Sequence, residues 1–114
     1  MKKRLLTLLA CTIAFPAIAM TDKAKEEVAQ ALTGDYQALR NVAYAMTSGS
    51  FGHDKNPISA CALRRVILFV NADQVESSDY SNEAIDCRAI HPTENQQAWE
   101  TALTIVKSIN ASRK

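Results

Sequence analysis

Apolar residues recur at helical spacing in the part of the chain that follows residue 20. Thr21 or Asp22 can cap a first helix, and Gly34 can end it. Asp35 can cap a second helix, which ends at Ser48-Gly49. The apolar positions on one face of the first helix are Ala24, Val28, Ala31 and Leu32, and those of the second are Leu39, Val42, Ala43 and Met46. Because side chains three and four positions apart share a helix face, the pattern predicts two consecutive amphipathic helices.

A third helix is predicted to begin at Asn56-Pro57. Asparagine caps helices, and proline is tolerated at the first helical position, where its missing N–H costs nothing. The helix continues through Cys61 into Val66–Val70, which is apolar on every side, as expected of a central buried helix. A strand is the alternative for Val66–Val70, because the run is rich in β-branched and aromatic residues. The unbroken pattern from Ile58 favours the helix.

The remaining third of the chain is more polar. Residues 71–81 are acidic and are predicted to form a linker, and a short helix of about residues 82–90 follows. Thr93-Glu94-Asn95-Gln96 has the pattern of a capping box for a last helix. The apolar stripe of that helix is predicted to consist of Trp99, Ala102, Leu103, Val106 and Ile109, with Trp99 largely buried. The sequence therefore predicts an all-α fold of about five helices in antiparallel hairpins, in a single domain of residues 20–114.

The first nineteen residues have a different pattern. A short basic start, Met1–Arg4, precedes a mostly apolar run, Leu5–Phe15, and a small-x-small site, Ala17–Ala19. This order is typical of a bacterial secretory signal peptide, and the apolar run is well short of the roughly 20 residues that a membrane span needs. We therefore expect cleavage after Ala19 and a periplasmic protein without stable membrane insertion. Alternatively, Leu8–Cys11 resembles a lipobox, which would make Cys11 a lipid-anchored N-terminus.

Charge and cysteine content narrow the class of protein. Loss of Lys2, Lys3 and Arg4 lowers Lys+Arg from 13 to 10 against 12 Asp+Glu, so the net charge changes from +1 to about −2. Such a chain lacks the basic surplus that nucleic-acid binding requires. Two cysteines remain, Cys61 and Cys87, and an even pair in an oxidising compartment predicts a disulfide worth roughly 3 kcal/mol. A reactive or metal-binding pair is disfavoured because there is no C-x-x-C motif.

The stretch Ala38–Gly49, followed by Asn56–Ala62, resembles a Sel1-like repeat, a tetratricopeptide-related unit of two antiparallel helices. The residues that carry the resemblance are Ala38, Tyr44, Gly49, Gly52, Asn56 and Ala60. A poorer second copy extends from Tyr80 to Ala102. The resemblance implies protein binding, with Tyr44 packed inside the first pair. Two pairs are fewer than a free solenoid usually needs, which favours a partner protein or a homodimer.

Candidate chemistry is sparse in residues 20–114. His53-Asp54 is adjacent in sequence, so the two side chains cannot easily orient one another, and no motif places a nucleophile beside them. The acidic run from Asp73 to Asp86 lacks the turn glycine and alternating ligands of a calcium loop. We expect neither an enzyme nor a metal or other cofactor. The acidic run is either a solvated linker or a recognition surface for a basic partner, with Glu76, Asp79 and Glu83 as candidate contacts.

A small, exported, disulfide-bonded, all-helical chain without catalytic residues resembles the immunity proteins that inhibit peptidoglycan amidases delivered by type VI secretion. That resemblance implies inhibition by steric occlusion of the toxin's active site. The candidate partner-binding segment is the loop Ser50–Lys55, with the contacts Phe51, His53, Asp54 and Lys55, because it joins two helices and carries an aromatic residue. The alternative is a small helical-repeat adaptor in an envelope protein assembly.

Overall fold

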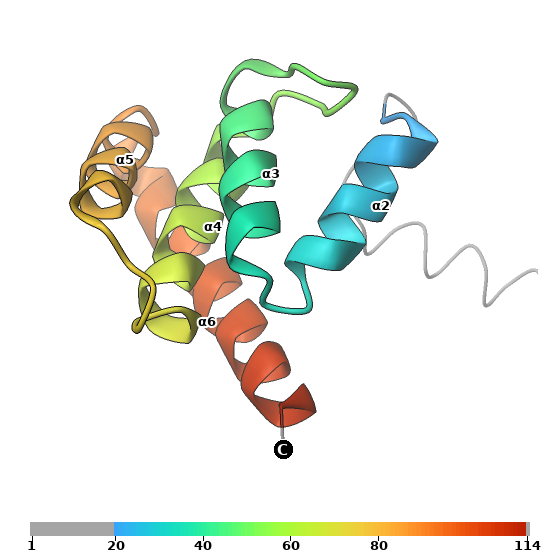
Figure 1. Ribbon diagram of the computed structural model, residues 1–114. Coiled ribbons are helices and arrows are strands. Elements are labelled where there is room, and N and C mark those ends of the chain that lie inside the picture. The colour runs from blue at the N-terminus through green and yellow to red at the C-terminus, as the bar shows by residue number, and fades with distance from the viewer. Residues whose placement is uncertain (1–19, 114) are drawn as a thin grey trace, which may run out of the picture.

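The computed structural model describes residues 20–113 (Figure 1). Capping side chains define the starts of the first three helices in this range. These helices are α2 (Asp22–Ala31), α3 (Tyr36–Ser48) and α4 (Pro57–Val70). Side-chain oxygens of Thr21, Asp35 and Asn56 accept hydrogen bonds from backbone N–H groups at the three starts, with donor–acceptor distances of 3.1, 2.8 and 3.1 Å. The predicted caps are thus confirmed. The expected signal peptide, its cleavage after Ala19 and the alternative lipobox lie outside the described residues.

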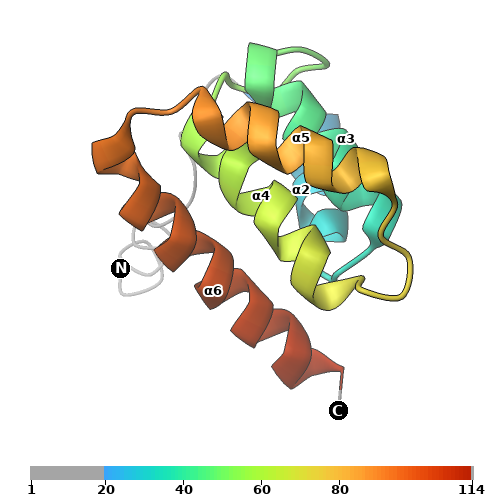
Figure 2. The same cartoon turned by 90° about the vertical axis from the view of Figure 1, so that its left-hand side faces the viewer.

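The second half of the chain contributes α5 (Ser77–Arg88), a short 3₁₀ helix η2 (Pro92–Glu94) and α6 (Asn95–Ser112). Helix α4 is central: it contacts α3, α5 and α6, while α2 packs on α3. Figure 2 shows α4 between α5 and α6. The described residues contain no strand, so the all-α prediction is confirmed and the strand alternative for Val66–Val70 is wrong. None of the helices within residues 20–113 is long and apolar enough to cross a membrane.

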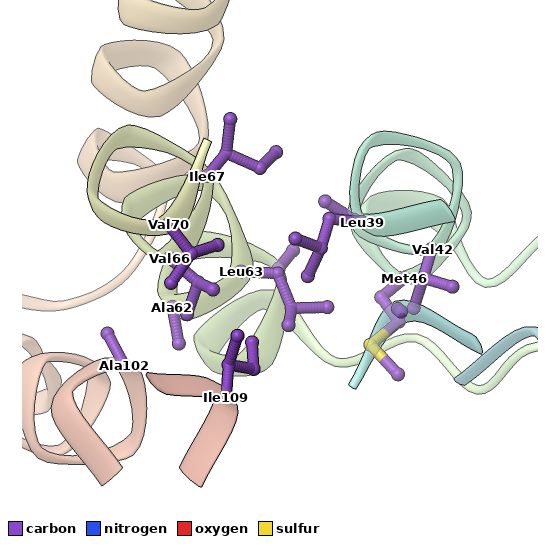
Figure 3. Packing of buried hydrophobic residues seen from close by; sticks show 13 residues of the cluster. Leu39, Val42, Met46, Ala62, Leu63, Val66, Ile67, Val70, Ala102 and Ile109 are labelled. Atoms are coloured by element: carbon purple, nitrogen blue, oxygen red, sulfur yellow. The ribbon is translucent and has the colours of Figure 1, made fainter. Parts of the chain in front are cut away.

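The main core forms where α3 and α6 pack against α4 (Figure 3). Its larger buried side chains are Leu39, Val42 and Met46 from α3, Leu63, Val66, Ile67 and Val70 from α4, and Ile109 from α6. A smaller cluster combines Cys61 with Ile90 and Ala98. The disulfide Cys61–Cys87 lies beside it and joins α4 to α5, as predicted, across 26 positions of sequence.

The acidic segment is helical where a linker was expected. Helix α5 begins at Ser77 because its carboxylates bind cationic and hydroxyl groups of α3 and α4 instead of facing water. Asp86 Oδ2 lies 2.8 Å from Arg64 Nε, and Glu83 Oε2 lies 3.2 Å from Arg65 Nε. The free-linker interpretation of residues 77–81 is therefore wrong.

The last helix keeps Ala102, Val106 and Ile109 of the predicted stripe against the core, whereas Trp99 and Leu103 are exposed. His91, not Thr93, caps η2 by accepting a hydrogen bond from Thr93 N–H, and α6 begins at Asn95. The buried positions of α6 are Ala98, Ala102 and Ile109. Trp99 is 37% exposed, which corrects its predicted burial. Its ring covers the Arg65 guanidinium, whose Cζ is 4.1 Å from the ring centroid.

Candidate functional site

The loop between α3 and α4, residues 50–55, is here called the Phe51 loop. Gly49 ends α3 with φ 75°, and Gly52 has φ 82°. Between them Phe51 has φ 54°, and within residues 20–113 no other non-glycine residue has a positive φ. A bulky side chain in this region is strained by roughly 1–3 kcal/mol, so neighbouring contacts must hold it there. The Phe51 side chain is nevertheless 74% exposed and contributes little to the core.

Backbone hydrogen bonds fix both sides of the Phe51 loop. His53 N–H donates to the Ser50 carbonyl at 3.0 Å, and Asn56 N–H donates to the Met46 carbonyl at 2.8 Å. Thr21 N–H donates to the Gly52 carbonyl at 3.1 Å, which joins the loop to the start of α2. Figure 1 shows the loop extending from the end of α3 toward that start. These bonds attach the loop to the end of α3 and to the start of α2.

His53 is inside the molecule. Its side chain has no exposed surface, and its Nε2 lies 2.8 Å from Glu27 Oε1 on α2. Its Nδ1 is buried and has no hydrogen-bond partner among residues 20–113. His53, a predicted contact of the partner-binding loop, is therefore not exposed at the surface of the loop. No local sequence pattern could have identified Glu27, since it lies 26 positions away on another helix.

A groove of about 520 Å³ lies between α2 and α3 beside Phe51. It is lined by Lys23, Glu27, Asn41, Tyr44, Ala45 and Phe51. The rings of Tyr44 and Phe51 are tilted by 38° with centroids 6.4 Å apart. Tyr44 is 62% exposed, contrary to the packed position that the Sel1-like resemblance implied. The groove thus combines two exposed aromatic rings with a rim of charged and amide groups, which suits contact with another protein.

The acidic candidates do not join this site. Asp79 is buried and accepts a hydrogen bond from Tyr36 at the start of α3, and this bond raises the pKa of the tyrosine. The 13 residues of α3 separate that position from the Phe51 loop by about 20 Å. Glu83 binds Arg65, and Glu76 is exposed at the start of α5. Of the remaining loop candidates, Asp54 is half-buried and Lys55 is exposed.

Within residues 20–113 no group of three or more histidine, cysteine, aspartate or glutamate side chains could hold a metal ion. The groove and the loop present apolar surface together with charged and amide groups. Comparison with protein-family models, curated proteins and solved structures gave no match.

Proposed function

We propose that this chain is a periplasmic protein-binding module, and specifically an immunity protein that inhibits a peptidoglycan amidase toxin by steric occlusion of its active site. The observation that carries the proposal is Phe51, a 74% exposed aromatic side chain on a strained backbone. Strained conformations concentrate at functional positions, where the surrounding structure maintains them at a cost in stability. Large aromatic side chains also dominate the energetics of many protein interfaces.

The rigidity of the Phe51 loop favours inhibition. Because hydrogen bonds fix the loop on both sides, little conformational entropy is lost when Phe51 enters a cleft. An apolar ring on such a support can fill an enzyme's substrate cleft without being a substrate. The proposed compartment follows from the signal peptide expected in residues 1–19, and the Cys61–Cys87 disulfide suits an oxidising environment.

The second candidate function is an envelope adaptor with a Sel1-like architecture, and the groove between α2 and α3 favours it. A volume of about 520 Å³ is sufficient for one or more apolar side chains of a bound peptide. Lys23, Glu27 and Asn41 provide polar groups at the rim that could orient such a peptide. In this function Tyr44 would contribute as much to binding as Phe51.

The proposed inhibition can be tested with the substitution Phe51→Ala. Recipient cells that lack the protein should lyse beside siblings that deliver a type VI amidase, and the wild-type protein should restore survival. We expect Phe51→Ala to abolish this protection, since loss of a central aromatic contact commonly costs 2 kcal/mol or more of binding free energy. Circular dichroism and the melting temperature should remain nearly unchanged, because the ring is exposed.

The matched control is Phe69→Ala, which removes another exposed phenylalanine, 53% accessible, from α4. This variant should protect fully. Normal protection by a folded Phe51→Ala variant would place the inhibitory surface elsewhere. Survival of the deletion strain beside attacking siblings would contradict the immunity function and favour the adaptor, for which Tyr44→Ala should then weaken partner capture.

A further inference from the structure

Helix α2 and the Phe51 loop are connected at two consecutive residues that directly follow Phe51. Thr21 N–H, at the start of α2, donates to the Gly52 carbonyl, and Glu27 Oε1 on α2 pairs with His53 Nε2. The first contact is close: a Cβ atom on Gly52 would lie 2.4 Å from Thr21 Oγ1. Apart from these connections, α2 packs chiefly on α3. The orientation of Phe51 therefore depends on α2 as well as on the turn in which Phe51 itself lies.

Of the two connections, the one at His53 is the more consequential. The imidazole is fully buried, and Nδ1 has no partner within residues 20–113. Its hydrogen bonding therefore rests on Glu27 alone. If the Glu27 carboxylate is removed, both ring nitrogens are left buried without partners, which is unfavourable because each lost its hydration on folding. The imidazole then regains partners only by moving toward water, and this movement displaces the Phe51 loop.

We propose that Glu27 is a positioning residue: through His53 it holds the Phe51 loop closed on α2 and keeps Phe51 at the edge of the groove. The functional consequence of this inference rests on the proposed function, in which Phe51 enters the partner. Glu27 also lines the groove, and its side chain is 38% exposed, so the contact that positions the loop is adjacent to the binding surface. Helix α2 thereby holds the Phe51 loop in place and also forms one wall of the groove.

Amide hydrogen exchange on the isolated full chain tests this role without any partner. The Thr21 and His53 amides report the loop, since they donate to the Gly52 and Ser50 carbonyls. The Asn71 amide donates to Ile67 at the far end of α4 and reports the core. In Glu27→Ala we expect exchange at Thr21 and His53 to accelerate at least about tenfold, with Asn71 unchanged.

Two variants make the result specific. Glu27→Gln retains an oxygen acceptor for His53 Nε2 and should restore exchange to within about threefold of wild type. Glu26→Ala makes the same change at the next, exposed position of α2 and should have no effect. Equal acceleration at Asn71, or no acceleration at Thr21 and His53, would overturn the positioning role. Cell survival with Phe51→Ala decides the proposed function separately, because the exchange experiment contains no toxin.

Discussion

Asp35 shows how neighbours tune a single side chain. Its pKa lies below the ordinary value of 3.8 because Ala38 N–H donates to the carboxylate, and the Gln30 amide donates a second hydrogen bond. Both bonds favour the charged form. A carboxyl group whose pKa is lowered on folding contributes stability at pH values above its unfolded pKa. That contribution is lost as the pH falls through the folded pKa.

The substitution Asp35→Asn separates the cap from its charge. Asparagine caps helices about as well as aspartate, so we expect the free energy of unfolding at pH 7 to stay within about 0.5 kcal/mol of wild type. Between about pH 4 and pH 2 the variant should lose less stability than wild type, because it has no ionisation to lose there. Urea denaturation at a series of pH values measures this difference. Parallel pH profiles would show that the charge contributes nothing, and Asp35→Ala, which lacks any cap, should lose about 1 kcal/mol at pH 7.

At the level of helices, features set by local interactions could be predicted from the sequence, and features set by distant residues could not. The starts of α2, α3 and α4 could be predicted because a cap bonds a backbone group three positions away. Helix α5 could not be predicted correctly, because its carboxylates pair with side chains 18 to 43 positions away. The acidic residues suggested a solvated linker, but two of them, Asp86 and Glu83, form ion pairs with Arg64 and Arg65. In α6, Ala98 takes the buried position that was predicted for Trp99, and the Trp99 ring lies over the Arg65 guanidinium.

The candidate site likewise combines features that local sequence predicts with features that depend on distant residues. The end of the second helix at Gly49 and the loop of residues 50–55 that follows it were predicted from local turn chemistry. The burial of His53 and the exposure of Tyr44 did not, because both depend on where α2 lies against α3. A loop can therefore be identified as a candidate from its sequence, while the side chains that it presents depend on its tertiary neighbours.

The disulfide is the covalent connection between α4 and α5, and its removal has a predictable effect. Cys87→Ser should lower the free energy of unfolding by about 3 kcal/mol, by the loop-closure argument for 26 positions. Because either substitution breaks the same bond, the double variant with Cys61→Ser should be little less stable than the single one. Urea denaturation without reductant measures this, and wild-type protein treated with a reductant should match the variants. Two reactive thiols in unfolded, unreduced wild-type protein would contradict the bridge.

In the molecule as a whole, Arg113 connects three elements. Its guanidinium donates to the Val70 carbonyl at the end of α4, 2.7 Å away, and to the Gly34 carbonyl between α2 and α3, 3.1 Å away. Asn71 donates to the same Gly34 carbonyl at 3.0 Å. The end of α6 is thus attached both to the end of α4 and to the turn between α2 and α3.

Arg113→Lys should show that the planar, two-pronged donor matters more than the charge. A lysine ammonium cannot reproduce the fork that spans both carbonyls, so we expect a loss of about 1–3 kcal/mol in the free energy of unfolding. The matched control is Arg88→Lys at an exposed position of α5, which should be neutral within about 0.5 kcal/mol. Equal stability of the Arg113→Lys variant and wild type would show that the forked geometry of the guanidinium contributes nothing at this junction.

The Arg113 junction also has a consequence for the order of events in folding. Most helix contacts here join neighbours along the chain, whereas Arg113 and Gly34 are 79 positions apart. Helical proteins dominated by local contacts fold fast because they close few long loops before the transition state, so a contact of such long range is expected to form after it. Stopped-flow measurements should then find that Arg113→Lys speeds unfolding and leaves the refolding rate constant unchanged. The Arg113 junction would then form last during folding and break first during unfolding, so it would slow unfolding without affecting the rate of folding.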